Sequence, residues 1–132
     1  MLFDIDPNSP IPIFEQIVDQ VVFHIASGGL EVGDLIPSVR ELGTRLTVHP
    51  NTVAKAFQQL ERLGVVAARR GRGMEVTPDA VKLCQSRRRE IVGKRIRDTL
   101  REAVSSGLAP DVVRRLVEEE LSRVNGKQHG GG

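Results

Sequence analysis

The sequence predicts a mainly α-helical protein with one small β-hairpin, divided into an N-terminal domain and a C-terminal pair of helices. Apolar residues recur at helical spacing through most of the chain, and glycine or proline separates the segments. A β-prone run, a glycine-rich turn and a second β-prone run follow one another at 65–77. The charge is uneven as well. Residues 37–73 hold seven lysines and arginines against two acids, a net charge of +5, whereas residues 1–36 hold six acids and no lysine or arginine.

The first predicted helix begins at about Pro12, after an extended segment at 1–9. Its apolar positions share one side of the helix, which we therefore expect to be buried against later helices. These positions are Phe14, Ile17, Val18, Val21, Val22 and Ile25. Gly28 and Gly29 end the helix. Residues 30–34 are predicted to form a turn that adds at most a short strand to the hairpin.

Two shorter helices follow, joined by a tight turn at 47–49. Ser38 and Glu41 form a capping box, in which the serine hydroxyl accepts from a free backbone N–H and the glutamate reaches back to the cap. Pro50 suits the first position of the next helix because the N–H that it lacks would be unpaired there. Apolar residues then recur at helical spacing until Gly64, a good C-terminal stop. Two such helices, the second beginning with small polar residues, are typical of a helix-turn-helix that reads DNA.

The hairpin that comes directly after these helices is interpreted as a wing. Residues 65–68 and 74–77 are its strands. Three arginines and two glycines at its tip favour a close approach to phosphate or to a narrow minor groove. A solvated turn is the alternative interpretation of Arg69, Arg70 and Arg72, and we favour nucleic acid because the arginines surround glycines in a basic region.

A family resemblance is carried by PIFEQI, IPSVRELGTRLTVHPNTVAKAFQQLERLGVV and RRGRG. In this order and spacing they resemble the winged helix-turn-helix of the GntR family of bacterial transcription regulators, over about residues 10–78. The resemblance implies that Arg40 contacts a base, that the start of the second helix touches bases and phosphates, and that the wing tip enters the minor groove. The full set of expected DNA-binding residues is Ser38, Arg40, His49, Asn51, Thr52, Lys55, Arg69, Arg70, Gly71 and Arg72.

Three positions differ from the family's usual pattern. Thr47 holds a turn position that is usually glycine, which predicts a strained or rearranged turn. His49 stands where a small polar residue is commoner, and Glu75 replaces the usual aromatic residue after the wing, so the packing of that strand is expected to differ. Asn51 and Thr52 also suit a capping role at the start of their helix, and capping can coexist with DNA contact.

A second helical region begins after residue 79. Residues 80–106 form one long helical pattern that contains Gly93, and Asp111 can cap a further helix. Neither helix can bury its apolar stripe alone, so we expect an antiparallel helical hairpin that pairs with the same hairpin of another chain. The residues expected at this dimer interface are Val92, Ile96, Leu100, Val104, Leu116, Val117 and Leu121.

The sequence thus predicts a DNA-binding domain at 1–79, a two-helix dimerisation region at 80–124 and a disordered tail at 125–132. The short C-terminal region is similar to the two-helix appendage of the YtrA subfamily, whose role is dimerisation. Any ligand cavity between such helices would be small, and the residues identify no small-molecule effector.

A basic cluster at 87–89, continued by Lys94, Arg95 and Arg97, has two interpretations. In the first, it is a solvated helix face whose charges pair with acids such as Glu90 and Glu118 to Glu120. In the second, it contacts backbone phosphate of DNA. We favour the solvated face, because exposed charges on a helix usually pair only weakly and locally.

Several classes of protein are excluded. No run of about 18 apolar residues could span a membrane, and the acidic start lacks the basic region of a signal peptide. The single cysteine, Cys84, agrees with a reducing cytoplasm, where we expect the protein. No residues have the spacing of a zinc site, and no nucleophile elbow or phosphate-binding loop is present. We therefore expect no cofactor, no metal and no enzymatic activity.

The predicted function is sequence-specific DNA binding by a transcription regulator. We expect a repressor that binds a palindromic operator as a homodimer, and repression itself is implied by the resemblance. The alternative is a winged-helix protein-interaction or RNA-binding module without base-specific DNA readout. The basic wing and the polar start of the recognition helix favour the regulator, since an interaction module would tend to expose apolar residues there.

Overall fold

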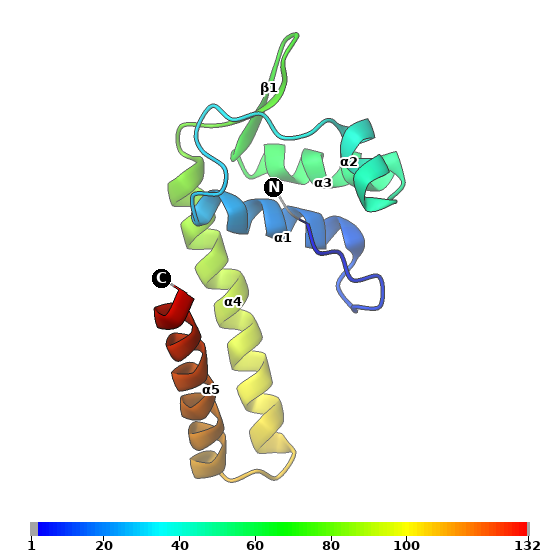
Figure 1. Ribbon diagram of the computed structural model, residues 1–132. Helices are drawn as coiled ribbons and strands as arrows, with labels where there is room; N and C mark the ends of the chain where they lie inside the picture. The colour runs from blue at the N-terminus through cyan, green and yellow to red at the C-terminus, as the bar shows by residue number, and fades with distance from the viewer. Residues whose placement is uncertain (1–2, 132) are drawn as a thin grey trace. The chain divides into compact units, whose positions relative to one another are not determined.

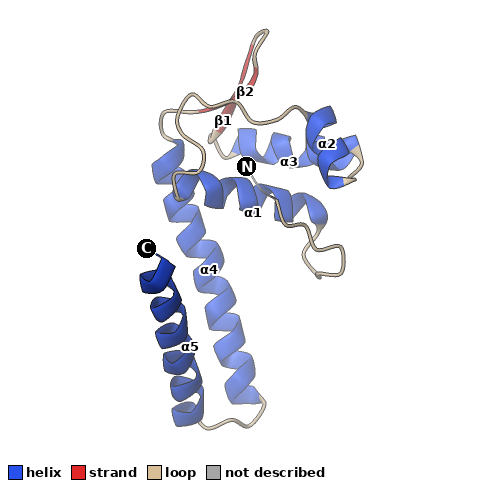
Figure 2. Cartoon of the chain, viewed as in Figure 1, coloured by secondary structure: helices blue, strands red, loops and turns tan. Residues whose placement is uncertain are grey.

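The computed structural model describes residues 3–131, which form two compact units that divide within one long helix, after Glu90. The elements of the first unit are α1 (Ile13–Ala26), α2 (Val39–Leu46), α3 (Pro50–Arg62), β1 (Val66–Arg69), β2 (Gly73–Val76) and the start of α4 (Ala80–Ser105) (Figures 1 and 2). The second unit contains the rest of α4 and α5 (Pro110–Gly131). None of the described helices is both long and apolar enough to cross a membrane.

The core of the first unit lies where α1 and α2 pack against α3. The apolar side of α1 is buried, as its spacing predicts, and packs against α3, which also packs against α2. Each fully buried aliphatic side chain contributes about 1.5–3 kcal/mol to folding. The largest fully buried side chains are Ile17, Val21, Val22, Ile25, Leu42, Val53, Leu60, Val65, Val66, Val76 and Cys84. This core fixes the helix-turn-helix and the base of the hairpin on one scaffold.

A buried glutamine fastens the N-terminal segment to α1. Gln16 Nε2 donates to the carbonyl oxygens of Asp6 (2.9 Å) and Ile11 (2.8 Å), and its Oε1 accepts from the Asp6 N–H (2.8 Å). Its side chain is buried among apolar neighbours, where an unpaired amide would be costly. The segment before α1 is therefore held by side-chain bonds to its backbone.

The hairpin is antiparallel, and residues 33–36 add a short third edge to it. Val66 is paired with Val76 at its base and Arg69 with Gly73 at its tip. Leu35 forms an isolated bridge with Glu75, and the Ile36 N–H donates to the carbonyl oxygen of Met74 at 3.0 Å. The sequence predicted a short added strand at 30–34, and the structure puts the strand contact slightly later in the chain.

The C-terminal half differs from the sequence-based boundaries at two points. The first compact unit extends to Glu90, past the predicted limit at 79, because Ala80 and Cys84 of α4 are buried in its core. Helix α5 continues to Gly131, through residues predicted to be a disordered tail, and Gly132 lies outside the described residues. No proline interrupts the segment after Val124, and each further residue of an established helix adds a backbone hydrogen bond.

Candidate nucleic-acid interface

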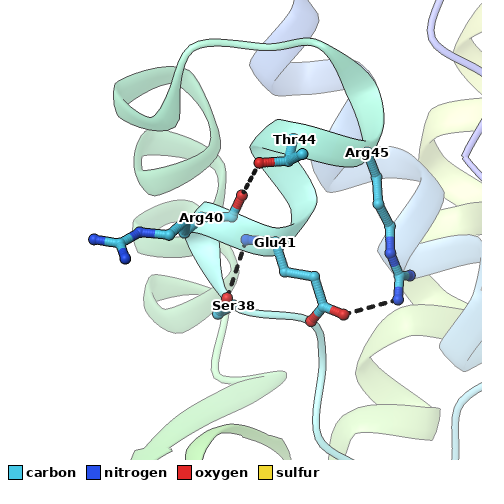
Figure 3. A network of polar contacts seen from close by, with 5 residues as sticks. All are labelled: Ser38, Arg40, Glu41, Thr44 and Arg45. Atoms are coloured by element: carbon cyan, nitrogen blue, oxygen red, sulfur yellow. Dashed lines mark hydrogen bonds and ion pairs between the residues drawn. The ribbon is translucent and has the colours of Figure 1, made fainter.

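Helix α2 begins at a serine cap, but only half of the predicted capping box forms. Ser38 Oγ accepts from the Glu41 N–H at 3.1 Å, as predicted. The Glu41 carboxylate does not turn back to the cap. It accepts instead from Arg45 at 2.9 Å, one helical turn later (Figure 3). A cationic partner in the same helix competes successfully with a backbone N–H for this carboxylate.

Arg40 lies on the exposed side of α2 and takes no part in this ion pair. Figure 3 shows its side chain directed away from Glu41 and Arg45. Within residues 3–131 its guanidinium has no ion-pair partner, and only its backbone carbonyl is used, as the acceptor for Thr44 Oγ1 at 3.0 Å. Its five N–H donors are thus available for bidentate recognition of a base or a phosphate.

The turn between α2 and α3 is strained at one residue and tightly closed at another. Thr47 has φ 54° and ψ 47°, a left-handed conformation that costs a non-glycine residue roughly 1–2 kcal/mol. The prediction of a strained turn is confirmed. The Val48 N–H donates to the carbonyl oxygen of Gly43 at 2.9 Å, and a Cβ at Gly43 would lie 2.9 Å from the carbonyl oxygen of Val48. Only glycine fits there without movement of the turn.

Helix α3 is capped by His49, not by the asparagine or threonine that follow it. His49 Nδ1 accepts from the Asn51 N–H at 3.0 Å, and Pro50 occupies the first helical position as predicted. Asn51 is exposed and Thr52 is half-buried. Because the imidazole supplies the cap, both side chains at the start of α3 are left to meet a ligand.

Lys55, one turn farther along α3, is held against α1. Its Nζ lies 4.0 Å from the centre of the Phe14 ring, a cation–π contact worth roughly 0.5–1 kcal/mol at an exposed site. A phosphate could bind Lys55 in this position or draw it away from the ring at that cost. The contact links the recognition helix to α1 through residues far apart in the sequence.

The three arginines of the wing are not equivalent. Arg69 Nε donates to Glu75 Oε2 at 2.6 Å, across the two strands. The two residues are diagonal neighbours, because Arg69 is opposite Gly73 and Glu75 is one pair farther from the turn than Met74. Glu75, which replaces an aromatic residue in the family pattern, thus fixes the wing by an ion pair. Arg69 is therefore already paired.

The wing tip carries the unpaired charge. Arg70 and Arg72 are exposed, and within the part of the chain that the structure describes neither forms an ion pair. Gly71 between them has φ +76°, a conformation that favours glycine, and the Arg72 N–H closes the turn on the carbonyl oxygen of Arg69 at 2.9 Å. Two exposed guanidinium groups on a narrow tip suit phosphate or a minor groove.

Three residues that position this surface were absent from the sequence-based set. Gly43 closes the turn, Phe14 holds Lys55, and Glu75 holds Arg69. A glycine inside a short helix destabilises the helix and often marks a place where another part of the backbone comes close, so the sequence could have identified Gly43. Phe14 had no such signal, because Lys55 is far from it in the sequence, and the pairing of Glu75 with Arg69 depends on the register of the hairpin.

The residues predicted for a dimer interface lie on the second unit and face solvent in the single chain. Val92, Ile96, Leu100, Val104, Leu116, Val117 and Leu121 are each more than a third exposed. All of them except Leu116 line two shallow apolar grooves between α4 and α5, of about 380 and 410 Å³. Among the basic residues nearby, Lys94 pairs with Asp98 at 2.7 Å, and this hydrogen bond lowers the pKa of the Asp98 carboxyl.

Comparisons with known proteins agree with this architecture. The family model for bacterial regulatory proteins of the gntR family matches residues 13–76, from the first residue of α1 to the end of β2. The transcriptional repressor YtrA of Bacillus subtilis is 32% identical over 125 residues, which are 95% of this chain and 96% of that protein.

Solved structures support the same fold over nearly the whole chain. A GntR family transcriptional regulator from Listeria monocytogenes has a TM-score of 0.70 and 28% identity, covering 86% of this chain and 97% of that one. YtrA from Sulfolobus acidocaldarius, a GntR-family transcription factor, has a TM-score of 0.56 and 30% identity, covering 93% and 99%. The predicted fold class, mainly helical with a small β wing, is confirmed.

Proposed function

This chain belongs to the GntR family of bacterial regulatory proteins, which are transcription regulators and not enzymes, and we propose that it represses transcription as a homodimer on a palindromic operator. The observation that carries the proposal is that, among the described residues, the side chains of Arg40, Asn51 and the wing-tip arginines of one unit have no partner. Other groups fill the structural roles on this surface: His49 caps α3, Glu41 pairs with Arg45, and Glu75 pairs with Arg69.

The DNA contacts fall into two kinds. In a helix-turn-helix the start of the second helix enters the major groove, where Asn and Arg can each form bidentate hydrogen bonds with a base. We assign base reading to Arg40, Asn51 and Thr52. The tip at Arg70 and Arg72 then meets backbone phosphate or the minor groove, and it adds affinity that depends little on sequence.

A second copy of the chain is the partner that fits the exposed apolar stripe of α4 and α5. One helix-turn-helix contacts one half-site, and two half-sites in neighbouring major grooves are about 34–36 Å apart. A pair of readers must therefore be held at a fixed separation. The stripe on the second unit is the largest run of exposed apolar side chains in the described residues, and its burial against its own copy would supply that link.

Repression is inferred from the relative of nearly equal length, YtrA of Bacillus subtilis, which is named as a transcriptional repressor. A dimer seated on a promoter excludes polymerase by occupying the same DNA. No further domain is needed for this mechanism, since steric exclusion depends only on affinity and on position.

Binding to the DNA upstream of the protein's own gene tests the proposal. Fluorescence anisotropy of the full chain is measured on palindromic fragments from that region and on scrambled fragments of equal composition. We expect a specific complex about a thousandfold or more tighter than the complex with scrambled DNA at physiological salt. Equal affinity for both fragments, or preference for RNA of the same sequence, would contradict base-specific DNA reading.

A further inference from the structure

The first unit contains a pocket that the DNA-binding surface does not use. It has a volume of about 190 Å³ and lies among α1, the segment after α3 and the first turns of α4. Its lining residues are Val22, Leu63, Val65, Leu83, Cys84, Ser86, Arg87 and Glu90. For scale, an apolar cavity of roughly 150 Å³ accepts benzene, so the pocket can hold a small branched aliphatic group.

The inner part of the pocket is apolar and carries no charge. Val22 and Val65 are fully buried members of the core, and Leu63 and Leu83 extend the apolar wall. Cys84 is also fully buried, and burial raises the pKa of its thiol to about 11. The thiol is therefore neutral at pH 7 and behaves as a small apolar group.

The polar part of the pocket comes from one face of α4. Arg87 and Glu90 are three residues apart on the helix, a spacing that puts their side chains next to each other. Among the described residues they do not form an ion pair with each other, and Arg87 Nε is buried without a hydrogen-bond partner. Arg87 as a residue is half-buried and lines the pocket, and Glu90 at the pocket's edge is exposed, so a guanidinium without an ion-pair partner there can take an anionic ligand.

We propose that this pocket binds a free aliphatic α-amino acid of the size of valine or leucine. The carboxylate accepts from Arg87, the ammonium donates to Glu90, and the branched side chain fills the apolar part between Val22, Val65 and Leu83. In an α-amino acid both charges are attached to the same carbon, so they match two opposite charges that are neighbours on a helix. The sequence-based expectation that this arginine pairs with Glu90 is replaced by a ligand between the two.

Simpler ligands match the pocket less well. An aliphatic carboxylate would satisfy Arg87 but would face the carboxylate of Glu90 with nothing between them. An aliphatic amine would pair with Glu90 and leave the guanidinium of Arg87 without an anionic partner. A phosphate ester would fill the polar part and leave the apolar wall in contact with water.

Isothermal titration calorimetry on the full chain, without DNA, tests this assignment with three related probes. L-leucine has all three recognised groups, isocaproate lacks only the ammonium, and isoamylamine lacks only the carboxylate. We expect saturable binding of leucine with one site per chain, and binding of the other two weaker by about tenfold or more, since each lacks one charged hydrogen bond. Leucine should also raise the melting temperature, because it binds only the folded unit.

Substitutions separate the two charged roles. Arg87→Met should weaken leucine binding by about tenfold or more, whereas Arg89→Met, which removes a neighbouring exposed arginine outside the pocket, should leave it unchanged. Glu90→Gln should abolish the preference for leucine over isocaproate. Circular dichroism melting of each variant is the control that checks whether it is folded.

Three results would overturn the proposal. They are the absence of binding by both leucine and valine at millimolar concentration, undiminished binding by Arg87→Met, and equal affinity of the wild-type chain for leucine and isocaproate. The measurement needs no operator, so its failure leaves the DNA-binding proposal intact, and failure of DNA binding leaves this one intact.

Discussion

Arg40 and Arg45 lie on the same short helix and differ in how far their charge is already used. Arg45 is held by Glu41 at 2.9 Å, whereas Arg40 has no ion-pair partner in the part of the chain that the structure describes. An exposed ion pair stabilises a protein by only about 0–1 kcal/mol, so loss of Arg45 should be tolerated. The two arginines therefore differ in whether the guanidinium group is available for a ligand.

Arg40→Ala is therefore expected to weaken specific operator binding by about tenfold or more, since a bidentate arginine contributes about 1–3 kcal/mol of discrimination. The fold should be unchanged, because the cap of α2 uses Ser38 and the backbone of Glu41. Anisotropy titrations of operator DNA with the wild type, Arg40→Ala and the control Arg45→Ala measure this loss of affinity. Similar losses in both variants would indicate a general electrostatic effect and argue against base reading by Arg40.

The proposed function gives separate tasks to the wing and to the recognition helix, α3. The wing presents Arg70 and Arg72 on a glycine turn, and its stem is fixed by the Arg69–Glu75 pair. The recognition helix presents Asn51 and Thr52 behind a histidine cap. Cations that meet phosphate contribute to all DNA binding, whereas polar side chains at base edges contribute to the preferred sequence alone.

Replacement of both Arg70 and Arg72 by alanine should reduce affinity for specific and non-specific DNA alike. The salt dependence of binding should become flatter by about one to two units of slope, because fewer counterions are released. Thr52→Ala should instead change the ratio of specific to non-specific affinity. Titrations at several salt concentrations test this, and an unchanged salt slope in the wing variant would contradict phosphate contact.

Gly43→Ala tests the turn between α2 and α3 as an element. The added Cβ would lie 2.9 Å from the carbonyl oxygen of Val48, so the turn must shift. We expect the free energy of unfolding to fall by roughly 1–3 kcal/mol, the usual cost of overpacking. Gly126→Ala is the matched control, since a Cβ there meets nothing within 4 Å. Thermal unfolding followed by circular dichroism compares each variant with the wild type. If Gly43→Ala is as stable as the wild type, the turn accommodates the added Cβ without cost.

The chain as a whole has a buried core in its first unit and an exposed apolar stripe in its second. The second unit buries few of its own apolar side chains, and of these only Val113 is less than a tenth exposed among the described residues after Glu90. Two helices with so little internal core are marginal alone, whereas two copies together could bury the stripe. This asymmetry is the reason for placing dimerisation in the C-terminal unit.

If the proposed dimer forms through this stripe, Leu100→Asp should yield a monomer that has lost specific operator binding and retains weak, salt-sensitive affinity. The new carboxylate would be buried without a partner in the dimer but hydrated in the monomer, a difference of several kcal/mol. Analytical ultracentrifugation followed by titration on a palindrome measures both effects. Leu108→Asp is the control, since it makes the same change between the helices, outside the predicted stripe. A wild-type monomer with tight palindrome binding, or a dimeric Leu100→Asp, would assign these helices another purpose.

Sequence alone determined the order of the elements, the family and the position of the basic wing. These follow from local signals such as apolar periodicity, the cap at Ser38, the proline at the start of α3 and the glycines of the turns. A helix or a turn responds to residues a few positions apart, so a single sequence contains the information that is needed.

Tertiary structure decided which polar groups are already used and which remain for a ligand. Lys55 is above Phe14, Arg69 is held by Glu75, and Arg87 lines a pocket with its Nε unpaired. Cys84 is buried in the core of the first unit, and that unit ends at Glu90, whereas the sequence placed the end of the DNA-binding domain at residue 79. The physical reason is that side-chain pairing and burial depend on which distant segments meet, and local periodicity does not specify that meeting.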